Sequence, residues 1–195
     1  MHLNQEETAQ SQISKEEVLN TAVEAIFGNA LINNVHRAVL VEALVRRVLN
    51  EDWTWAAGDW AWCDFVHRDG TRLEVKQSAA RQTWHKAGDP RSKPSFDIAS
   101  RKGSWKGSEW IPGHGRNAEI YVFAYHPLTD VEADHANPKQ WIFYVAPTSR
   151  LPPLPRRSIS LPAVSCLCRP LRADELEQEV ESIRLLLPKS SFPMS

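Results

Sequence analysis

The chain has 195 residues, of which 42% are hydrophobic and 24% charged, and its formal net charge is −1. These values are near the average of globular proteins and fit one domain, long enough to bury a core. The near-neutral charge gives no overall indication of a nucleic-acid partner. Three cysteines, Cys63, Cys166 and Cys168, exclude a disulfide framework, and a Cys-x-Cys pair lacks the spacing of a zinc site.

The first twelve residues are polar and mixed in charge, so they do not resemble a signal peptide, which would be basic and then apolar. No apolar run approaches the roughly 20 residues that a membrane span needs. We therefore expect a cytoplasmic protein without a membrane partner.

Two helices are predicted before any strand. Residues 14 to 17 read Ser-Lys-Glu-Glu, which has the form of a capping box, and Val18, Ala22 and Ile26 follow at helical spacing up to Gly28. A second helix is predicted from residue 34 to residue 49.

Glu42 is unusual within the second helix because its neighbours at helical spacing are apolar. These neighbours are Val35, Ala38, Val39, Val45 and Leu49. A carboxylate buried there without a partner would cost on the order of several kcal/mol or become neutral. Either Glu42 reaches solvent or Arg46 at the edge of the helix, or it points at the acidic cluster described next.

A β-hairpin is predicted between residues 60 and 78, with the Asp-Gly pair at 69 and 70 as its turn. Successive side chains of a strand point to opposite faces, so Glu74 and Lys76 share one face. Folding back at the turn brings Asp64 towards Glu74. This trio is either a surface ion pair across the hairpin or a site for a hard divalent cation, since Mg²⁺ prefers carboxylate and carbonyl oxygens.

Residues 81 to 116 are basic: eight Lys and Arg against three Asp and Glu give a local excess of +5. Trp84, Trp105 and Trp110 are interleaved with these cations. Cations neutralise phosphates and aromatic rings stack on bases, so the segment is either a nucleic-acid surface or a solvated loop with tryptophans folded back as local core. The candidate nucleic-acid contacts are Arg81, Lys86, Arg101, Lys102, Lys106 and Arg116.

A turn that leads into a short helix carrying Gln82 and Trp84 is predicted from residue 78 to about 86, and residues 88 to 115 are expected to be mainly loop, with a possible strand at 95 to 100. Two buried strands are predicted at 119 to 125 and 141 to 146, because both are short β-branched and aromatic runs that end at proline. Residues 151 to 157 are proline-rich and are expected to be a surface connector. An amphipathic helix is predicted from 173 to 187, as a packing or dimer surface.

The order of these features resembles the PD-(D/E)XK nuclease superfamily. Asp64 matches the lone aspartate of the motif, and Glu74-Val75-Lys76 matches its (D/E)-x-K element. Cys63 departs from the pattern, because it stands where the family name has proline. The resemblance covers roughly residues 34 to 146, between a polar tail at 1 to 13 and a connector and helix at 147 to 195, in one domain of residues 1 to 195.

The resemblance implies an α/β fold of the restriction-endonuclease-like type, with an αβββαβ core and a central mixed sheet of four or five strands flanked by helices. Glu42 matches the glutamate that many members carry on the helix before the sheet, and Gln82 looks like the glutamine that some branches place after the lysine. Ser78, on the same strand face as Glu74 and Lys76, and Gln82 are then expected to contact a backbone phosphate or the metal-bound water, unless they are ordinary polar groups at the end of a strand.

The resemblance further implies a Mg²⁺-dependent endonuclease that hydrolyses DNA, with Mn²⁺ as a substitute metal and a restriction or defence role. Asp64, Glu74 and the backbone carbonyl of Val75 would bind the metal, and Lys76 would orient the attacking water or stabilise the developing charge. Glu42 would complete a second metal site or hold Lys76. The alternative is a catalytically weak module that binds nucleic acid or protein. A homodimer would be natural for cutting two strands.

Overall fold

The computed structural model describes residues 13–56, 62–86, 89–106 and 109–188. Its helices are α1 (Lys15–Phe27), α2 (Asn34–Val48), α3 (Leu161–Leu167) and α4 (Leu176–Leu186). Its strands are β1 (Trp53–Trp55), β2 (Phe65–His67), β3 (Arg72–Ala79), β4 (Ser95–Asp97), β5 (Arg101–Lys106), β6 (Glu109–Gly115), β7 (Ile120–His126), β8 (Ile142–Pro147) and β9 (Ser158–Ser160).

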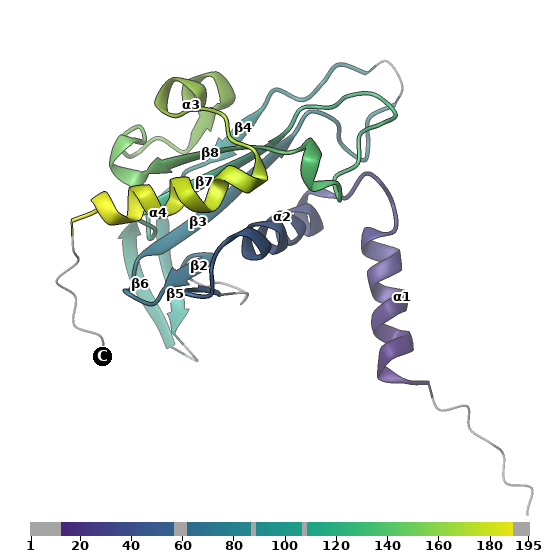
Figure 1. Cartoon of the computed structure of the whole chain (residues 1–195), viewed down its shortest axis with the longest axis horizontal. Coiled ribbons are helices and arrows are strands. Elements are labelled where there is room, and N and C mark those ends of the chain that lie inside the picture. The colour runs from purple at the N-terminus through teal and green to yellow at the C-terminus, as the bar shows by residue number, and fades with distance from the viewer. Residues whose placement is uncertain (1–12, 57–61, 87–88, 107–108, 189–195) are drawn as a thin grey trace, which may run out of the picture.

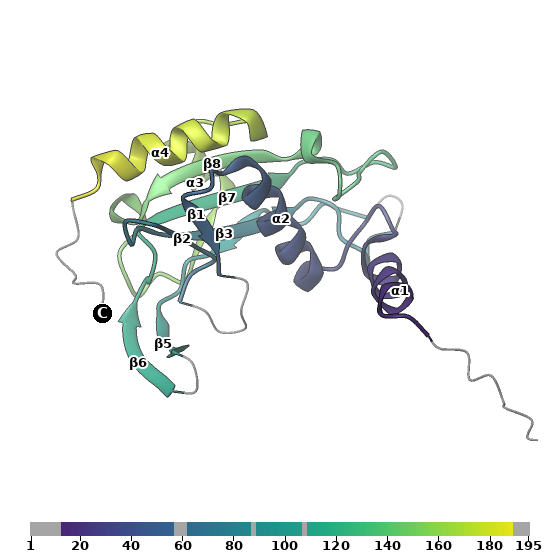
Figure 2. The same cartoon turned by 60° about the horizontal axis from the view of Figure 1, so that its bottom comes forward.

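The centre of the molecule is a mixed sheet with the strand order β1-β2-β3-β7-β8 (Figure 1). Strands β1, β2 and β3 are antiparallel neighbours, β3 runs parallel to β7, and β8 is antiparallel to β7. The predicted α/β class and mixed sheet are therefore confirmed. Strands β5 and β6 form a separate hairpin that projects from the sheet, as Figure 2 shows.

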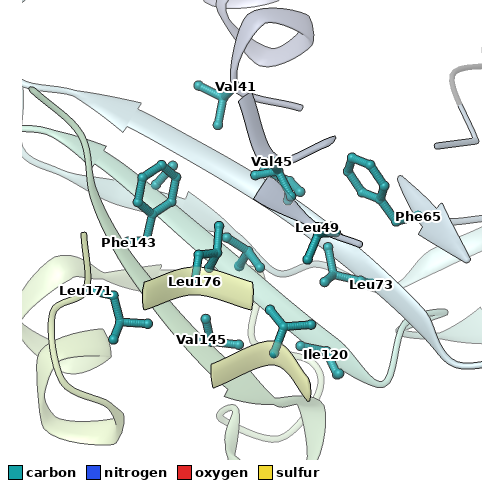
Figure 3. Packing of buried hydrophobic residues seen from close by; sticks show 14 of the residues in the cluster. Val41, Val45, Leu49, Phe65, Leu73, Ile120, Phe143, Val145, Leu171 and Leu176 are labelled. Atoms are coloured by element: carbon teal, nitrogen blue, oxygen red, sulfur yellow. The ribbon is translucent and has the colours of Figure 1, made fainter. Parts of the chain in front are cut away.

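Helices α2 and α4 cover one face of the sheet. Val41 and Val45 of α2 and Leu176 of α4 are completely buried against strand residues such as Leu73 and Ile120 (Figure 3). Burying an aliphatic side chain of this kind stabilises the fold by about 1.5–3 kcal/mol. The same packing fixes the position of α2 relative to β3, which matters because both elements carry residues of the candidate site.

The opposite face is covered by α3 and the small β4–β9 sheet. Phe96 of β4 packs against Phe123 of β7 with the rings tilted and their centroids 5.0 Å apart, and Ile159 and Val164 belong to the same second core. Since both faces are covered, β7 is buried along its whole length. Its uninterrupted apolar sequence is typical of a strand buried on both faces.

The observed boundaries of several helices and strands agree with the sequence predictions. The capping box at Ser14 begins α1, and α2, β7, β8 and α4 lie within a few residues of their predicted positions. The predicted hairpin turn is present: Gly70 has a φ of 89°, and its N–H donates to the carbonyl of His67 over 2.8 Å. Glycine adopts this backbone conformation without steric cost, which other residues rarely do.

The prediction of a helix at residues 78 to 86 was wrong. Strand β3 continues to Ala79, and the N–H of Ala80 still donates to the carbonyl of His126 on β7 over 2.9 Å. The chain then turns, because the His85 N–H donates to the Gln82 carbonyl and the Gln82 side chain bonds back to Ala79. The helix that an αβββαβ core places after this strand is absent from the described residues between β3 and β7.

The expectation of a loop from 88 to 115 was also wrong in part, because the β5–β6 hairpin occupies most of its second half. The possible strand at 95 to 100 is present in shorter form as β4. The proline-rich connector at 151 to 157 leads into β9 and α3, which the sequence analysis did not predict. Long-range pairing decides these strands: β4 pairs with β9, which lies more than sixty residues later in the chain.

Helix α1 stands away from the sheet in both views (Figures 1 and 2). It has no buried residues, and Val18, Leu19 and Val23 are each more than half exposed. Among the described residues, no helix has both the length and the apolar character to cross a membrane.

Candidate active site

Asp64 lies where β2 and β3 separate. The ladder between these strands ends at the pair Phe65 and Leu73, and the Asp64 N–H still donates to the Leu73 carbonyl over 3.1 Å. Beyond that point the Asp64 side chain takes the place of a β2 backbone group as the hydrogen-bond partner of β3. Oδ2 of Asp64 accepts the backbone N–H of Val75 over 2.6 Å. A charge-assisted hydrogen bond of this length holds the carboxylate at the open edge of β3.

The N–H and C=O of one strand residue point to the same side of the strand. The Val75 carbonyl therefore points towards the edge at which Asp64 lies.

Glu74 is 7% exposed and lies on the face of β3 opposite to α2. The Lys76 ammonium donates to its Oε1, and a guanidinium nitrogen of Arg101 lies 3.4 Å from the same oxygen. Arg101 comes from β5, so the projecting hairpin contributes a cation to the acidic residues of the sheet. Its side chain is 53% exposed, which leaves it accessible to solvent and to an anionic ligand.

Glu42 is half-buried, next to the buried face of α2 formed by Arg37, Val41 and Val45. Its Oε2 accepts the indole N–H of Trp55 over 2.9 Å. Burial raises the pKa of Glu42, and the negative charge of Glu74 adds to that effect, whereas Trp55 and Lys76 oppose it. The predicted apolar neighbours at the start of the helix are not core, since Val35 is 71% and Val39 45% exposed.

These groups line one cleft of about 1020 Å³. The predicted site residues Glu42, Asp64, Glu74, Val75 and Lys76 all take part in its walls. The remaining lining residues are Asn34, Ala38, Gln77, Ser95, Asp97, Ser100, Arg101, Lys102, Gly103 and Trp110. Most of the lining residues belong to α2, β3 and the β5–β6 hairpin.

Burial and mutual repulsion disfavour the ionised forms of Asp64 and Glu42 in the cleft. Burial, together with repulsion from Glu74 and Glu42, raises the pKa of Asp64 from 3.8 to about 7, against the opposing effects of Lys76 and the Val75 N–H. A cation placed between the carboxylates would remove this repulsion. Their oxygens are the ligands that Mg²⁺ prefers.

Comparisons of the chain with protein-family models, with curated proteins and with solved structures give no match.

The donor set fits a cation that keeps most of its waters. In the part of the chain that the structure describes, no group of three or more His, Cys, Asp or Glu side chains could hold a metal ion by itself. Two carboxylates and the Val75 carbonyl are a smaller set, of the kind that suits Mg²⁺, which is commonly bound through one or two carboxylates and water.

Two of the predicted supporting residues do not line the cleft. Gln82 is buried below it, where its Oε1 accepts from Arg37 over 3.0 Å and its amide donates to the Ala79 carbonyl over 2.7 Å. Ser78 is half-buried further along β3 and is not among the lining residues. The role of Gln82 is structural in this arrangement, because it ends β3 and holds Arg37.

Arg37 is a residue that the sequence analysis missed. It is 1% exposed and donates to Gln77 over 2.7 Å, to Asn34 over 2.9 Å and to the Ile32 carbonyl over 3.2 Å, as well as to Gln82. Asn34 and Gln77 line the cleft, so Arg37 fixes two polar groups in its wall. The sequence did contain a sign of this role: Arg37 lies on the same helical face as the apolar residues Val41 and Val45, and a charged residue in such a position needs a partner. The same reasoning identified Glu42.

The predicted nucleic-acid contacts are divided between several places. Arg101 and Lys102 line the cleft, whereas Arg81 and Lys86 line a smaller pocket of about 240 Å³ at the far end of β3. Arg116 donates to the Ile98 and Pro152 carbonyls over 2.8 Å each, so it ties the connector to β4. The side chain of Lys106 lies outside the described residues.

Proposed function

We propose that this protein is a Mg²⁺-dependent nuclease that hydrolyses phosphodiester bonds of DNA in the cleft beside β3. One observation carries the proposal: the hydrogen bond from the Val75 N–H to Asp64 holds Asp64 against the part of β3 that carries Glu74 and Lys76, beyond the end of its pairing with β2. Residues from α2, from β3 and from the segment before β2 thus line a single cleft. Surface ion pairs do not need such burial or such convergence.

In this proposal Asp64, Glu74 and the Val75 carbonyl hold Mg²⁺ or Mn²⁺. When bound, the ion lowers the pKa of a coordinated water and stabilises charge on the phosphate. Lys76 donates to the water or to a phosphate oxygen, for which its position beside Glu74 is suitable. Glu42, fixed by Trp55, balances the charge of Lys76 or extends the metal site.

The fold itself is proposed to be of the restriction-endonuclease-like type. The order α2, β1, β2, β3 and the parallel pairing of β3 with β7 support this assignment. The connection between β3 and β7 departs from the expected core, because it contains β4 and the β5–β6 hairpin. That departure brings Arg101 and Lys102 into the cleft, where they can hold phosphates.

The proposal is tested by incubating the purified protein with plasmid DNA, linear duplex, single-stranded DNA and RNA in the presence of Mg²⁺, Mn²⁺ or EDTA. We expect cleavage that requires the metal. Asp64→Asn and Lys76→Gln should each reduce its rate by at least about 100-fold, the usual cost of removing one charge-stabilising group.

Glu16→Gln and Lys139→Gln are matched controls, because both residues are exposed and neither lines the cleft. Cleavage that persists in Asp64→Asn and in Lys76→Gln would contradict the proposal. Metal-independent binding of DNA or RNA without cleavage would favour the alternative of a catalytically weak binding module. Light scattering during the same preparation shows whether the active species is a homodimer.

A further inference from the structure

The β5–β6 hairpin carries an aromatic side chain into the charged cleft. Trp110 is 38% exposed and lines the cleft with Arg101, Lys102 and Gly103 of the neighbouring strand. Neither metal binding nor hydrolysis, as proposed above, requires an indole at this position. Large exposed aromatic groups in functional clefts are typical of ligand contact.

Gly103 fixes the position of this indole. A Cβ at residue 103 would lie 2.7 Å and 2.9 Å from the ring carbons Cζ2 and Cε2 of Trp110, and 2.4 Å from the Ile111 carbonyl oxygen. The ring therefore packs directly against the β5 backbone, in space that any other residue would occupy. The φ of 153° at Gly103 also favours glycine. The indole is thus held in place before any ligand binds.

Trp110 lines the same cleft as the acidic residues. A guanidinium nitrogen of Arg101 is 3.4 Å from Glu74, and Arg101 lies two residues before Gly103, against which the indole packs. Strand β5 therefore carries both a cation that contacts Glu74 and the backbone that positions the indole. Lys102, exposed on the same strand, provides a further phosphate contact.

We propose that Trp110 is a stacking platform for an unpaired base next to the scissile phosphate, so that the substrate is single-stranded or locally unpaired nucleic acid. This inference rests on the proposed nuclease function. Every base of an intact duplex is stacked between its neighbours, and opening it costs a few kcal/mol. An unpaired base presents its face freely, and stacking on an aromatic residue is worth about 1–3 kcal/mol per base.

The test measures binding of a short fluorescein-labelled DNA oligonucleotide, free or annealed to its complement, by fluorescence anisotropy with Ca²⁺ to suppress cleavage. We expect the wild-type protein to bind the single strand more tightly than the duplex. Trp110→Ala should weaken single-strand binding by about 5- to 150-fold, the equivalent of the stacking energy, with little change for the duplex. Trp110→Phe should retain most of the affinity.

Trp84→Ala is the matched control, since Trp84 is 64% exposed and lies outside the cleft-lining residues. Circular dichroism and the melting temperature show whether Trp110→Ala is folded, and Trp110→Phe tests the ring if it is not. Equal losses for both substrates, no loss, or tighter binding of the duplex by the wild type would overturn the inference. Metal-dependent cleavage at an unchanged rate in Trp110→Ala would overturn the stacking inference but leave the proposed nuclease function intact. If no nucleic acid is cleaved at all, the proposed nuclease function fails as well.

Discussion

Replacing Asp64 by asparagine should make the metal-free protein more stable at pH 8. The pKa of Asp64 is raised from 3.8 to about 7, mainly by burial, so the folded state binds a proton more tightly than the unfolded chain does. The stability associated with this group is therefore complete below pH 4 and is lost as the pH rises through 7. A difference of about three pH units corresponds to at most about 4 kcal/mol.

The expected gain is smaller than this limit. Asparagine keeps an oxygen that can accept the Val75 N–H, but the bond is no longer charge-assisted, which costs about 1 kcal/mol. We therefore expect Asp64→Asn to raise the free energy of unfolding by about 1–3 kcal/mol at pH 8.

Urea denaturation in the presence of EDTA, at pH 8 and at pH 4.5, measures this gain. The gain should be largest at pH 8 and should largely disappear at pH 4.5, where Asp64 of the folded wild type is protonated. Mg²⁺ should stabilise the wild type more than the variant. If the variant is destabilised equally at both pH values, the ionised Asp64 carboxylate does not destabilise the metal-free fold and the reasoning is refuted.

Three further predictions concern residues around the site. The pKa of His135 is lowered to about 4 by burial and by Arg37, so the free energy of unfolding should fall as the pH drops from 6.5 towards 4. Urea titrations at pH 7 and pH 5 should show a smaller fall for His135→Gln than for the wild type. Arg37→Met should lower the free energy of unfolding by about 2–4 kcal/mol in the same assay, because it leaves the side-chain oxygens of half-buried Gln77 and buried Gln82 without their donor. Cys166 is exposed and should react rapidly with a thiol reagent, whereas buried Cys63, with its pKa raised to about 12, should react only in denaturant; equal rates would contradict the structure.

Local sequence patterns were sufficient for much of the scaffold. The capping box, the Asp-Gly turn and the apolar runs of β7 and β8 act through neighbouring residues, and each was predicted close to its observed position. Residues 80 to 86 were different, because Gln82 bonds to Arg37, which lies 45 residues earlier. A contact between distant residues overrides local helix propensity and cannot be recognised from local spacing.

The same distinction applies to the candidate site. Strand alternation and the turn predicted that Asp64 and Glu74 approach each other, and both line the observed cleft. Arg101 was predicted as a nucleic-acid contact and Trp110 only as a member of a basic and aromatic segment. Their place in the cleft depends on the pairing of β5 with β6 and on the small residue at 103, which no periodic pattern indicates.

Iron-directed cleavage of the protein itself tests most directly whether this cleft holds a divalent cation. Fe²⁺ replaces Mg²⁺, ascorbate and peroxide generate hydroxyl radicals at the bound ion, and mass spectrometry locates the backbone cuts. We predict cuts next to Asp64 and at residues 74 to 76, suppressed by excess Mg²⁺ and absent from an Asp64→Asn, Glu74→Gln double variant. Cuts located elsewhere, or unchanged in that variant, would contradict the metal site and with it the proposed hydrolysis.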